Sequence, residues 1–224
     1  MYFKKNLDEL VYDRILDDIF SATWEFGDVL NADELAARYN ISRTPVVQAL
    51  KRLATDGILS FKSNGKPWFP PVTEKTLEDI LGVRELLEHY AVRLICEQRI
   101  PVANDELYLC YHRCEQFRLS ERRSDASRED LRFHHTIVDS LQNEALSSVY
   151  DRIQKKFISI NYLSLRNMPR WAVVTPESSQ DHLHLFEALQ RFDLEEASRC
   201  VSGHLQIARA LVSEKLTHYA ASRP

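Results

Sequence analysis

The stretch LAARYNISRTPVV, residues 35–47, decides the fold of the first part of the chain. Its first half has the spacing of a short helix, which Asn40 and the residue after it interrupt. Ser42 belongs to the residue types that cap the start of a helix, and Pro45 falls in the first helical turn, where its missing N–H has no cost. The stretch therefore predicts a helix, a short turn and a second helix that continues to about Asp56.

Elements on both sides of this stretch complete a small domain. Apolar residues at helical spacing precede it, and after Asp56-Gly57 two short extended runs flank the turn residues Ser63-Asn64-Gly65, which is typical of a β-hairpin. Pro70-Pro71 then forms a stiff linker. The expected elements are helices over residues 7–21, 34–39 and 42–56, followed by strands over residues 58–61 and 67–69. Helices and a hairpin in this order make a winged helix-turn-helix, which we expect over residues 1–71.

The charge of the chain is distributed unevenly. The whole sequence has a net charge of −4, which by itself does not favour a nucleic-acid binder. Residues 1–37 carry three basic against nine acidic side chains, whereas residues 38–71 carry six basic side chains against Asp56 alone. The first segment is therefore −6 and the second +5. A local basic surface of this kind is what binding to DNA phosphates requires.

The second helix of a helix-turn-helix lies in the major groove of DNA, and its first residues meet base edges and phosphates. Arg43 is placed to make a bidentate contact with guanine, and Ser42 and Thr44 are placed to bind phosphate with the help of the positive helix N-terminus. The hairpin would touch the backbone or the minor groove. The candidate DNA-binding residues are Ser42, Arg43, Thr44, Val47, Gln48, Lys51, Arg52, Lys62, Asn64, Gly65 and Lys66.

The rest of the chain, residues 72–224, has the pattern of one helix after another, without a strand signal. The low content of five glycines and eight prolines agrees with a largely helical protein. A polar stretch over residues 120–127 is expected to be a loop, and residues 167–170 are expected to break a helix. The predicted helices cover residues 73–98, 104–119, 128–141, 143–165, 176–191 and 193–217. The fold class is therefore mainly α: the winged helix-turn-helix and a C-terminal antiparallel bundle of six to seven helices.

Four residues of this bundle have a spacing that permits a metal site, because side chains of neighbouring helices can meet in a bundle core. The first two are four residues apart and share one helix face. The candidate ligands are Asp130, His134, His182 and His204. His135 and His184 are adjacent alternatives, about 100° round the helix from the better candidates, and we assign them to supporting or surface positions. Spacing alone leaves open that the histidines are surface or ordinary core residues.

The four cysteines and the absence of long apolar runs describe the setting of the protein. Cys110 and Cys114 lie one helical turn apart and Cys96 and Cys200 are isolated; without a C-x-x-C pair, reduced and partly buried thiols are expected. No segment approaches the roughly 20 apolar residues of a membrane span, and none resembles a signal peptide. We therefore expect a cytoplasmic protein without a membrane partner.

The opening stretch, together with Ala49-Leu50, Arg52-Leu53 and residues 56–59, resembles the GntR family of bacterial regulators, whose pattern is close to LAxxxxVSRTPVREALxxLxxxGLV. The resemblance covers residues 7–71 and implies a homodimer that binds double-stranded DNA at a palindromic operator. One departure is that Val47-Gln48 replaces the family's Arg-Glu. That Arg usually contacts DNA, so either Lys51 or Gln48 takes over its contact, or a different base is read.

The bundle residues 130–134, Asn143, residues 182–189, Ala197 and His204-Leu205 resemble the FCD domain of the FadR-type subfamily. This resemblance implies a divalent metal, such as Zn²⁺, Ni²⁺ or Mn²⁺, held by the Asp and the three His above. It also implies a small organic acid whose carboxylate fills open positions on the ion. The candidate effector-binding residues are Arg84, Arg132 and Asn161. Arg84 resembles a family Arg that faces the cavity, and the alternative for it is an external salt bridge with Glu88.

These features together predict a transcription regulator, expected to be a repressor and not an enzyme. The acid would bind in the bundle and change the spacing of the two DNA-reading heads. Two other functions fit the same four ligands. A hydrolase would use a metal-activated water, and a direct metal sensor would respond to the ion alone. The effector, the operator, the regulated genes, the metal and the sign of regulation are not encoded in a form that the sequence pattern reveals.

Overall fold

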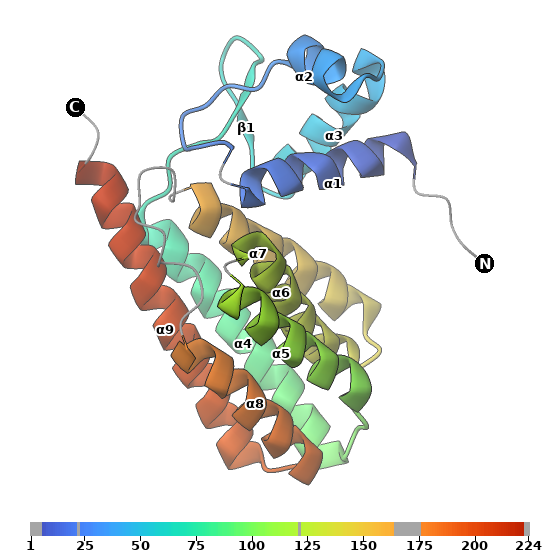
Figure 1. The fold of residues 1–224 in the computed structure, drawn as a ribbon, viewed down its shortest axis with the longest axis vertical. Helices are drawn as coiled ribbons and strands as arrows, with labels where there is room; N and C mark the ends of the chain where they lie inside the picture. Colours follow the sequence, from blue (N-terminus) through green and yellow to red (C-terminus); the bar gives the residue numbers. More distant parts are fainter. Residues whose placement is uncertain (1–5, 22, 121, 164–175, 222–224) are drawn as a thin grey trace.

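The computed structural model describes residues 6–21, 23–120, 122–163 and 176–221, and over these ranges the chain is mainly α, as predicted. The elements in chain order are α1 (Leu7–Phe20), α2 (Ala32–Tyr39), α3 (Arg43–Thr55), β1 (Ser60–Phe61), β2 (Pro67–Trp68), α4 (Glu74–Gln98), α5 (Asn104–Leu119), α6 (Arg123–Asp139), α7 (Glu144–Leu163), α8 (Pro176–Arg191) and α9 (Leu194–Ala221). Figure 1 shows a small head made of α1–α3 and the hairpin, and below it a bundle made of α4–α9.

The turn between α2 and α3 is as tight as the sequence predicts. Asn40 ends α2 in the left-handed conformation, with φ of 54°, and Ser42 occupies the capping position of α3. α2 starts two residues earlier than expected, because the Asn31 side chain caps it by accepting a hydrogen bond from the Asp33 amide. Behind this turn α1 packs against α3. The side chains buried there include Ile15, Ile19, Val46, Leu50 and Leu53.

The hairpin lies where the sequence places it, but its strands have only two residues each. β1 pairs antiparallel with β2, so that Ser60 lies opposite Trp68. Gly65 has a φ of +76° and closes the hairpin in a conformation that glycine adopts without strain. Ile58 and Leu59, which we expected in the first strand, are buried in the head core instead. The wing is therefore a short, exposed loop on a two-residue ladder.

The predicted loop over residues 120–127 is wrong, because α6 begins at Arg123. Polar residues made this segment look like a loop, but Ala126 and Ser127 are almost fully buried. The Ser127 hydroxyl accepts a hydrogen bond of 2.7 Å from the Tyr162 hydroxyl of α7. Packing against a neighbouring helix therefore overrides the weak helical propensity of the segment. The expected break at residues 167–170 lies outside the described residues.

The long helices α4 and α9 run antiparallel through the whole bundle. Ser213 donates a hydrogen bond to Glu74 near the start of α4, and His89 contacts Ser202 further along, at 3.0 Å. α9 continues to Ala221, four residues beyond the expected end, so its last turns reach the head (Figure 1). α4 also packs on α6 and α7. It is therefore the helix around which the bundle is assembled.

The head is joined to the bundle by polar and aromatic contacts. The Tyr12 hydroxyl of α1 donates to Asp56, and Arg152 of α7 lies 3.6 Å from the same carboxylate. Phe20, at the end of α1, packs on Tyr162 with 5.4 Å between the ring centroids. From α9, the Tyr219 hydroxyl donates to the backbone carbonyl of the Phe26 loop, and Arg128 of α6 pairs with Asp17 of α1. Movements of α6, α7 or α9 therefore reach the head directly.

Replacing Ile15 by Ala should lower the free energy of unfolding by about 2–5 kcal/mol, because Ile15 is fully buried between α1 and α3. Leu10→Ala on the same helix is the matched control: Leu10 is 50% exposed, and its loss should change the free energy by less than about 0.5 kcal/mol. Urea unfolding followed by circular dichroism measures both. Equal destabilisation by the two variants would contradict the packing described for α1.

Candidate metal centre and DNA-reading surface

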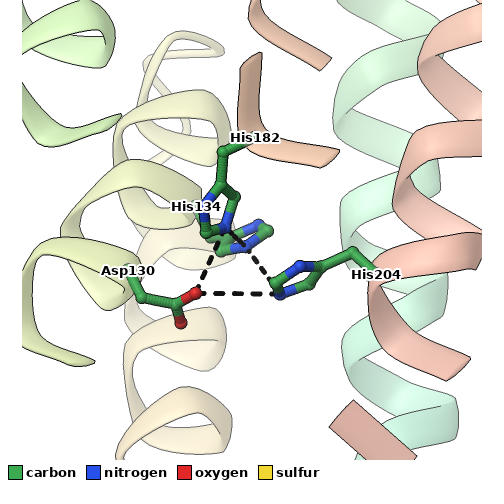
Figure 2. Close-up of side chains that lie close together, drawn as sticks. All are labelled: Asp130, His134, His182 and His204. Carbon is green, nitrogen blue, oxygen red and sulfur yellow. Dashed lines mark hydrogen bonds and ion pairs between the residues drawn. The ribbon is translucent and has the colours of Figure 1, made fainter. Parts of the chain in front are cut away.

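Four side chains from three helices converge in the core of the bundle (Figure 2). Asp130 and His134 project from α6 one turn apart, His182 comes from the middle of α8, and His204 comes from α9. One ligand atom of each lies within 4.8 Å of all the others. The three imidazoles are 5% exposed or less. The structure therefore brings together the whole set that the sequence singled out, although the four residues span 75 positions of the chain.

The distances within this set fit a bound cation. Nε2 of His134 lies 3.1 Å from Nε2 of both His182 and His204, and Oδ1 of Asp130 lies 3.1 Å from Nε2 of His182 and 3.8 Å from that of His204. A single proton on His134 Nε2 satisfies only one of its two neighbours. An ion about 2.1 Å from each ligand separates adjacent ligands by about 3.0 Å in octahedral and about 3.4 Å in tetrahedral geometry. The three separations of 3.1 Å fall in this range, and the separation of 3.8 Å between Asp130 and His204 lies above it.

Burial and mutual contacts favour the metal-binding protonation states of Asp130, His182 and His204. Burial lowers the pKa of His182 and His204, which favours neutral imidazole. Burial tends to raise the pKa of Asp130, but the hydrogen bond from His182 and the neighbouring imidazoles outweigh it and hold the pKa well below its usual value. A carboxylate and neutral imidazoles are the forms that bind metal ions.

The buried ion pair between Arg84 and Glu88 contacts His134 and orients its ring. Oε2 of Glu88 lies 3.1 Å from Nδ1 of His134, while Oε1 accepts hydrogen bonds from Arg84 Nε at 2.6 Å and from the Tyr150 hydroxyl at 2.7 Å. Burial alone would raise the pKa of Glu88, but Arg84 and His134 hold it well below its usual value. An ionised Glu88 favours the proton on Nδ1, which leaves the Nε2 lone pair directed at the other ligands.

The alternative that Arg84 and Glu88 form an external salt bridge is therefore wrong: their side chains are 1% and 3% exposed. The sequence analysis missed Tyr150, and it weighed Glu88 only as a partner of Arg84. The contacts of Glu88 with α6 and α7 cannot be predicted from a local sequence pattern, because these contacts join helices that are far apart in the sequence. The sequence feature that indicated a buried pair was the position of Glu88 one helical turn after Arg84, on a mostly apolar helix face.

A cavity of about 40 Å³ lies beside the ligands. Arg84 lines it, and its Nη2 atom is buried without a hydrogen-bond partner in the described part of the chain. The polar lining residues are Arg84, Ser127, Asp130, Asn161, His204 and Lys215, and the apolar ones are Phe157, Ile158, Ile207, Ala208, Leu211 and Val212. A small apolar cavity with a few convergent polar groups is typical of a ligand site.

Two of the three candidate effector residues line this cavity and one does not. Arg84 and Asn161 are part of the lining. Arg132 instead lies on the outside of α6, where it is 49% exposed and pairs with Glu106 of α5, so its assignment to the effector site is not supported by its position. Lys215 was missed, because a lysine near the end of a long polar helix looks like an ordinary surface residue.

The adjacent histidines and the four cysteines are not among the four converging ligands. His135 pairs with Asp139 at 2.8 Å near the surface, and His184 is exposed. All four cysteines are free and buried. Burial raises the pKa of the Cys110 thiol to about 12, so the thiolate that reacts or binds metal is not formed at neutral pH.

The candidate DNA-binding residues form an exposed surface on α3 and the wing. Ser42 makes no capping hydrogen bond with its own hydroxyl, and Arg43 pairs with Asp33 at 3.0 Å on the open surface. Lys62 lies over the Trp68 ring, 4.8 Å from its centroid. The exposed members of the set are Ser42, Arg43, Thr44, Gln48, Lys51, Arg52, Lys62, Asn64, Gly65 and Lys66, whereas Val47 is half-buried.

Arg52 differs from the other basic residues of this set. Its guanidinium lies over the Tyr12 ring, 4.6 Å from the centroid, and 4.0 Å from the Glu9 carboxylate, so the side chain is turned toward α1. Its position therefore explains the packing of α1 on α3 better than a contact to DNA.

Comparison with known proteins agrees with both parts of this description. Residues 7–68 match the model of the gntR family of bacterial regulatory proteins, and residues 79–207 match the FCD domain. The chain belongs to the GntR family. It is 32% identical to the Nta operon transcriptional regulator of Aminobacter aminovorans over 80% of this chain and 82% of that one. It is 30% identical to the gluconate operon transcriptional repressor of Bacillus subtilis over 66% of this chain and 60% of that one.

Solved structures of the GntR family confirm the fold. The Escherichia coli protein McbR/YncC has a TM-score of 0.80 at 20% identity, over 94% of this chain and 99% of that one. A GntR regulator from Rhodococcus has a TM-score of 0.75 at 14% identity, over 97% and 99%. The family and its named members are DNA-binding transcription regulators rather than enzymes, so the hydrolase alternative is set aside. No helix among the described residues is long and apolar enough to cross a membrane.

His204→Ala should lower the affinity for Zn²⁺ by about 100-fold or more, because it removes one of the four converging ligand atoms. The rise in melting temperature that bound ion produces should disappear with it. Glu88→Gln should lower the affinity by about 10–100-fold through the orientation of His134. Calorimetric titration of the metal-free protein measures these affinities. His135→Ala is the control and should bind Zn²⁺ like the wild type; an equal loss in this variant would contradict the assigned ligand set.

Proposed function

We propose that this GntR-family protein is a repressor whose DNA affinity is controlled by a small organic acid bound at a divalent-metal site in the bundle. Residues 1–71 read a palindromic operator as part of a homodimer, and residues 72–224 bind the effector and dimerise. The protein acts in the cytoplasm, where bacterial DNA lies. The observation that carries the proposal is the cavity lined by Arg84, Asp130 and His204, where Nη2 of Arg84 is buried without a hydrogen-bond partner among the described residues.

Asp130, His134, His182 and His204 would hold the ion, for which Zn²⁺, Ni²⁺ and Mn²⁺ all suit the mixed nitrogen and oxygen ligands. When bound, the ion supplies positive charge and open coordination positions for a carboxylate. Arg84 is held in place by its ion pair with Glu88, and its second terminal nitrogen remains for the same carboxylate. Because the ion site and Arg84 are both buried, a carboxylate would interact with them more strongly here than in water.

The residues exposed on α3 and the wing support the proposal that the protein binds an operator. α3 presents Arg43, Gln48 and Lys51 on its exposed face, which is the geometry of a recognition helix in the major groove. Val47 stands where the family has an Arg and is half-buried, so it leaves the polar reading of bases to these three residues. The wing adds Lys62 and Lys66 for the DNA backbone.

Arg43→Ala should weaken binding to the operator by about 10–100-fold and relax the preference for one base pair, because a bidentate Arg–guanine contact is worth about 1–3 kcal/mol. Lys66→Ala should weaken binding to all DNA sequences alike and reduce the slope of log K against log salt concentration by about one unit. Fluorescence polarisation with genomic fragments selected by the protein measures both. Arg191→Ala, on the exposed face of the bundle helix α8, is the control; an unchanged affinity of Arg43→Ala would exclude α3 as the reading helix.

The cavity is connected to the head through two pairs of neighbouring residues. On α6, Ser127 lines the cavity while Arg128 pairs with Asp17 of the head. On α7, Asn161 lines the cavity while Tyr162 packs on Phe20 of the head. The Tyr162 hydroxyl also donates to Ser127. An acid that displaces Ser127 or Asn161 therefore acts on helices that contact α1, which is how binding would alter the placement of the head.

Tyr162→Phe should reduce the effect of the acid on DNA affinity by roughly 2- to 30-fold, the range that coupling residues show. The variant keeps the ring that packs on Phe20 and loses the hydroxyl that donates to Ser127. Its affinity for DNA without effector and for Zn²⁺ should stay unchanged. The measurement is the ratio of DNA affinities without and with acid, taken from polarisation titrations with the most effective acid of a panel. Tyr108→Phe, at an exposed site of α5, is the control.

The same titration separates the proposal from a direct metal sensor. In the proposed regulator, Zn²⁺ alone leaves DNA affinity nearly unchanged, and the acid changes it only in the metal-loaded protein. A change of DNA affinity by the ion alone, with no further change by any acid, would favour the sensor. Absence of DNA binding at low salt, with and without metal, would contradict both.

A further inference from the structure

We propose that the protein forms its homodimer by packing α4 antiparallel against α4 of a second copy, with Leu86 on the two-fold axis. This inference rests on the proposed function, because it assigns the surface through which the proposed homodimer associates. The surface is a row of exposed residues along one face of α4, called here the α4 stripe. It consists of Lys75, Asp79, Gly82, Val83, Leu86, Tyr90, Arg93 and Glu97.

The centre of the α4 stripe is apolar. Leu86 is 68% exposed, Tyr90 is 40% exposed and Val83 is 39% exposed, and their spacing of three and four residues puts them on one helix face. α4 packs on α6, α7 and α9, but the described residues leave this face uncovered. Single exposed apolar residues are common on monomers. A row of them bordered by charged residues is typical of an interaction site.

The charged residues at the two ends of the stripe complement each other. In an antiparallel pair of α4 helices that cross at Leu86, residues equally far before and after Leu86 face each other. Lys75 and Glu97 lie eleven residues before and after it, and Asp79 and Arg93 lie seven residues before and after it. Each acidic residue would therefore face a basic residue of the second copy. The two-fold axis repeats each pair, as in an isologous interface.

The same charges disfavour other arrangements of two α4 helices. A shift of four residues in one direction would place Lys75 opposite the partner's Arg93. A shift of four residues in the other direction would place Asp79 opposite the partner's Glu97. A parallel pair would place every charge beside its own copy. Because like charges that face each other oppose association, the register centred on Leu86 is favoured over these three.

The shape of the stripe fits this register as well. Gly82 and Tyr90 lie four residues before and after Leu86, so the Tyr90 ring would face a position without a side chain. A side-chain carbon added at Gly82 would have no neighbour within 4 Å among the described residues, so this space is open in the single chain. Large residues opposite small ones let two helices interdigitate. The partner's Tyr90 would fill the space above Gly82.

The ion pairs of the stripe are available for contacts with a second copy. Lys75 pairs with Asp79, and Arg93 pairs with Glu97, and all four side chains are between 47% and 80% exposed. Exposed pairs of this kind contribute little by themselves. Across the proposed interface they would join into two networks of four charges. These networks would select the partner and the register, while the apolar centre would supply the affinity.

Analytical ultracentrifugation of the full-length protein over a dilution series tests the register with two charge-reversed chains. Asp79→Lys places a lysine opposite the partner's Arg93, and Arg93→Glu places a glutamate opposite the partner's Asp79. Each variant alone should dimerise about 10–100-fold more weakly than the wild type, because its homodimer contains two pairs of like charges. An equimolar mixture should dimerise like the wild type, since the heterodimer pairs all charges again. A chain with both substitutions should also recover.

Gly82→Leu tests the packing at the same interface. The site is open in the single chain, so the variant should keep its helical content by circular dichroism. It should still dimerise more weakly, because the new side chain occupies the space of the partner's Tyr90. Glu187→Lys and Arg191→Glu are the controls: they reverse an exposed ion pair with the same four-residue spacing on α8, and they should leave the dissociation constant of the dimer unchanged.

Unchanged dimerisation of the reversed chains, equal weakening by the α8 controls, or a mixture that dimerises no better than either chain alone overturns the α4 interface. A wild-type dimer that binds DNA still supports the proposed function in each of these cases. A wild type that stays monomeric at all concentrations overturns the interface and the proposed homodimer together. If a reversed chain does not fold, Gly82→Leu decides the outcome, and unchanged dimerisation of that variant overturns the interface.

Discussion

The buried contact chain from Arg84 through Glu88 to His134 is the constraint on which the rest of the bundle depends. Burying an ion costs several kcal/mol after relaxation, and only close pairing and further hydrogen bonds offset that cost. Here the carboxylate of α4 is shared by the Arg on its own helix, by Tyr150 of α7 and by His134 of α6. Moving any of these helices would leave a charge unpaired in the core. The relative placement of α4, α6 and α7 is therefore fixed, and with it the positions of Asp130 and His134 on α6.

The ligand set extends the same constraint to the remaining helices of the site. α6 provides two ligands, while α8 and α9 provide one each, so a bound ion would tie three helices that the Glu88 contacts do not all reach. α9 also contacts the head through Tyr219 and the Phe26 carbonyl. The ion and an acid beside it would therefore act on two helices that carry ligands and also contact the head, α6 through Arg128 and α9 through Tyr219. In the proposed regulator, the metal would therefore help to place the helices as well as bind the acid.

Sequence reasoning succeeded where the signal is local. Thr73 caps α4 by accepting a hydrogen bond from Thr76, and the helix ends at the expected residue; Asp130 and His134 announced a shared helix face. It failed where the signal is a contact between helices. α6 starts before residue 128 because Ser127 is buried against Tyr162. Local spacing pairs Glu88 with Arg84, but it does not reveal the contacts of Glu88 with α6 and α7 or the burial of Lys215. The family resemblance supplied His182 and His204, which spacing alone left open among eight histidines.

The state of the basic residues in the head explains which of them remain for DNA. The Arg43–Asp33 pair lies on the open surface, with both side chains more than 65% exposed, and such a pair contributes about 1 kcal/mol or less. Phosphates and a guanine edge can therefore replace Asp33 at little cost. Arg52 contacts the Tyr12 ring and Glu9, so it would have to lose two contacts, rather than one as for Arg43, before it could bind DNA. Val47 cannot donate a hydrogen bond from its side chain. In the proposed regulator, discrimination between bases would therefore depend on Arg43, Gln48 and Lys51, and the operator is expected to differ from that of relatives that keep the Arg.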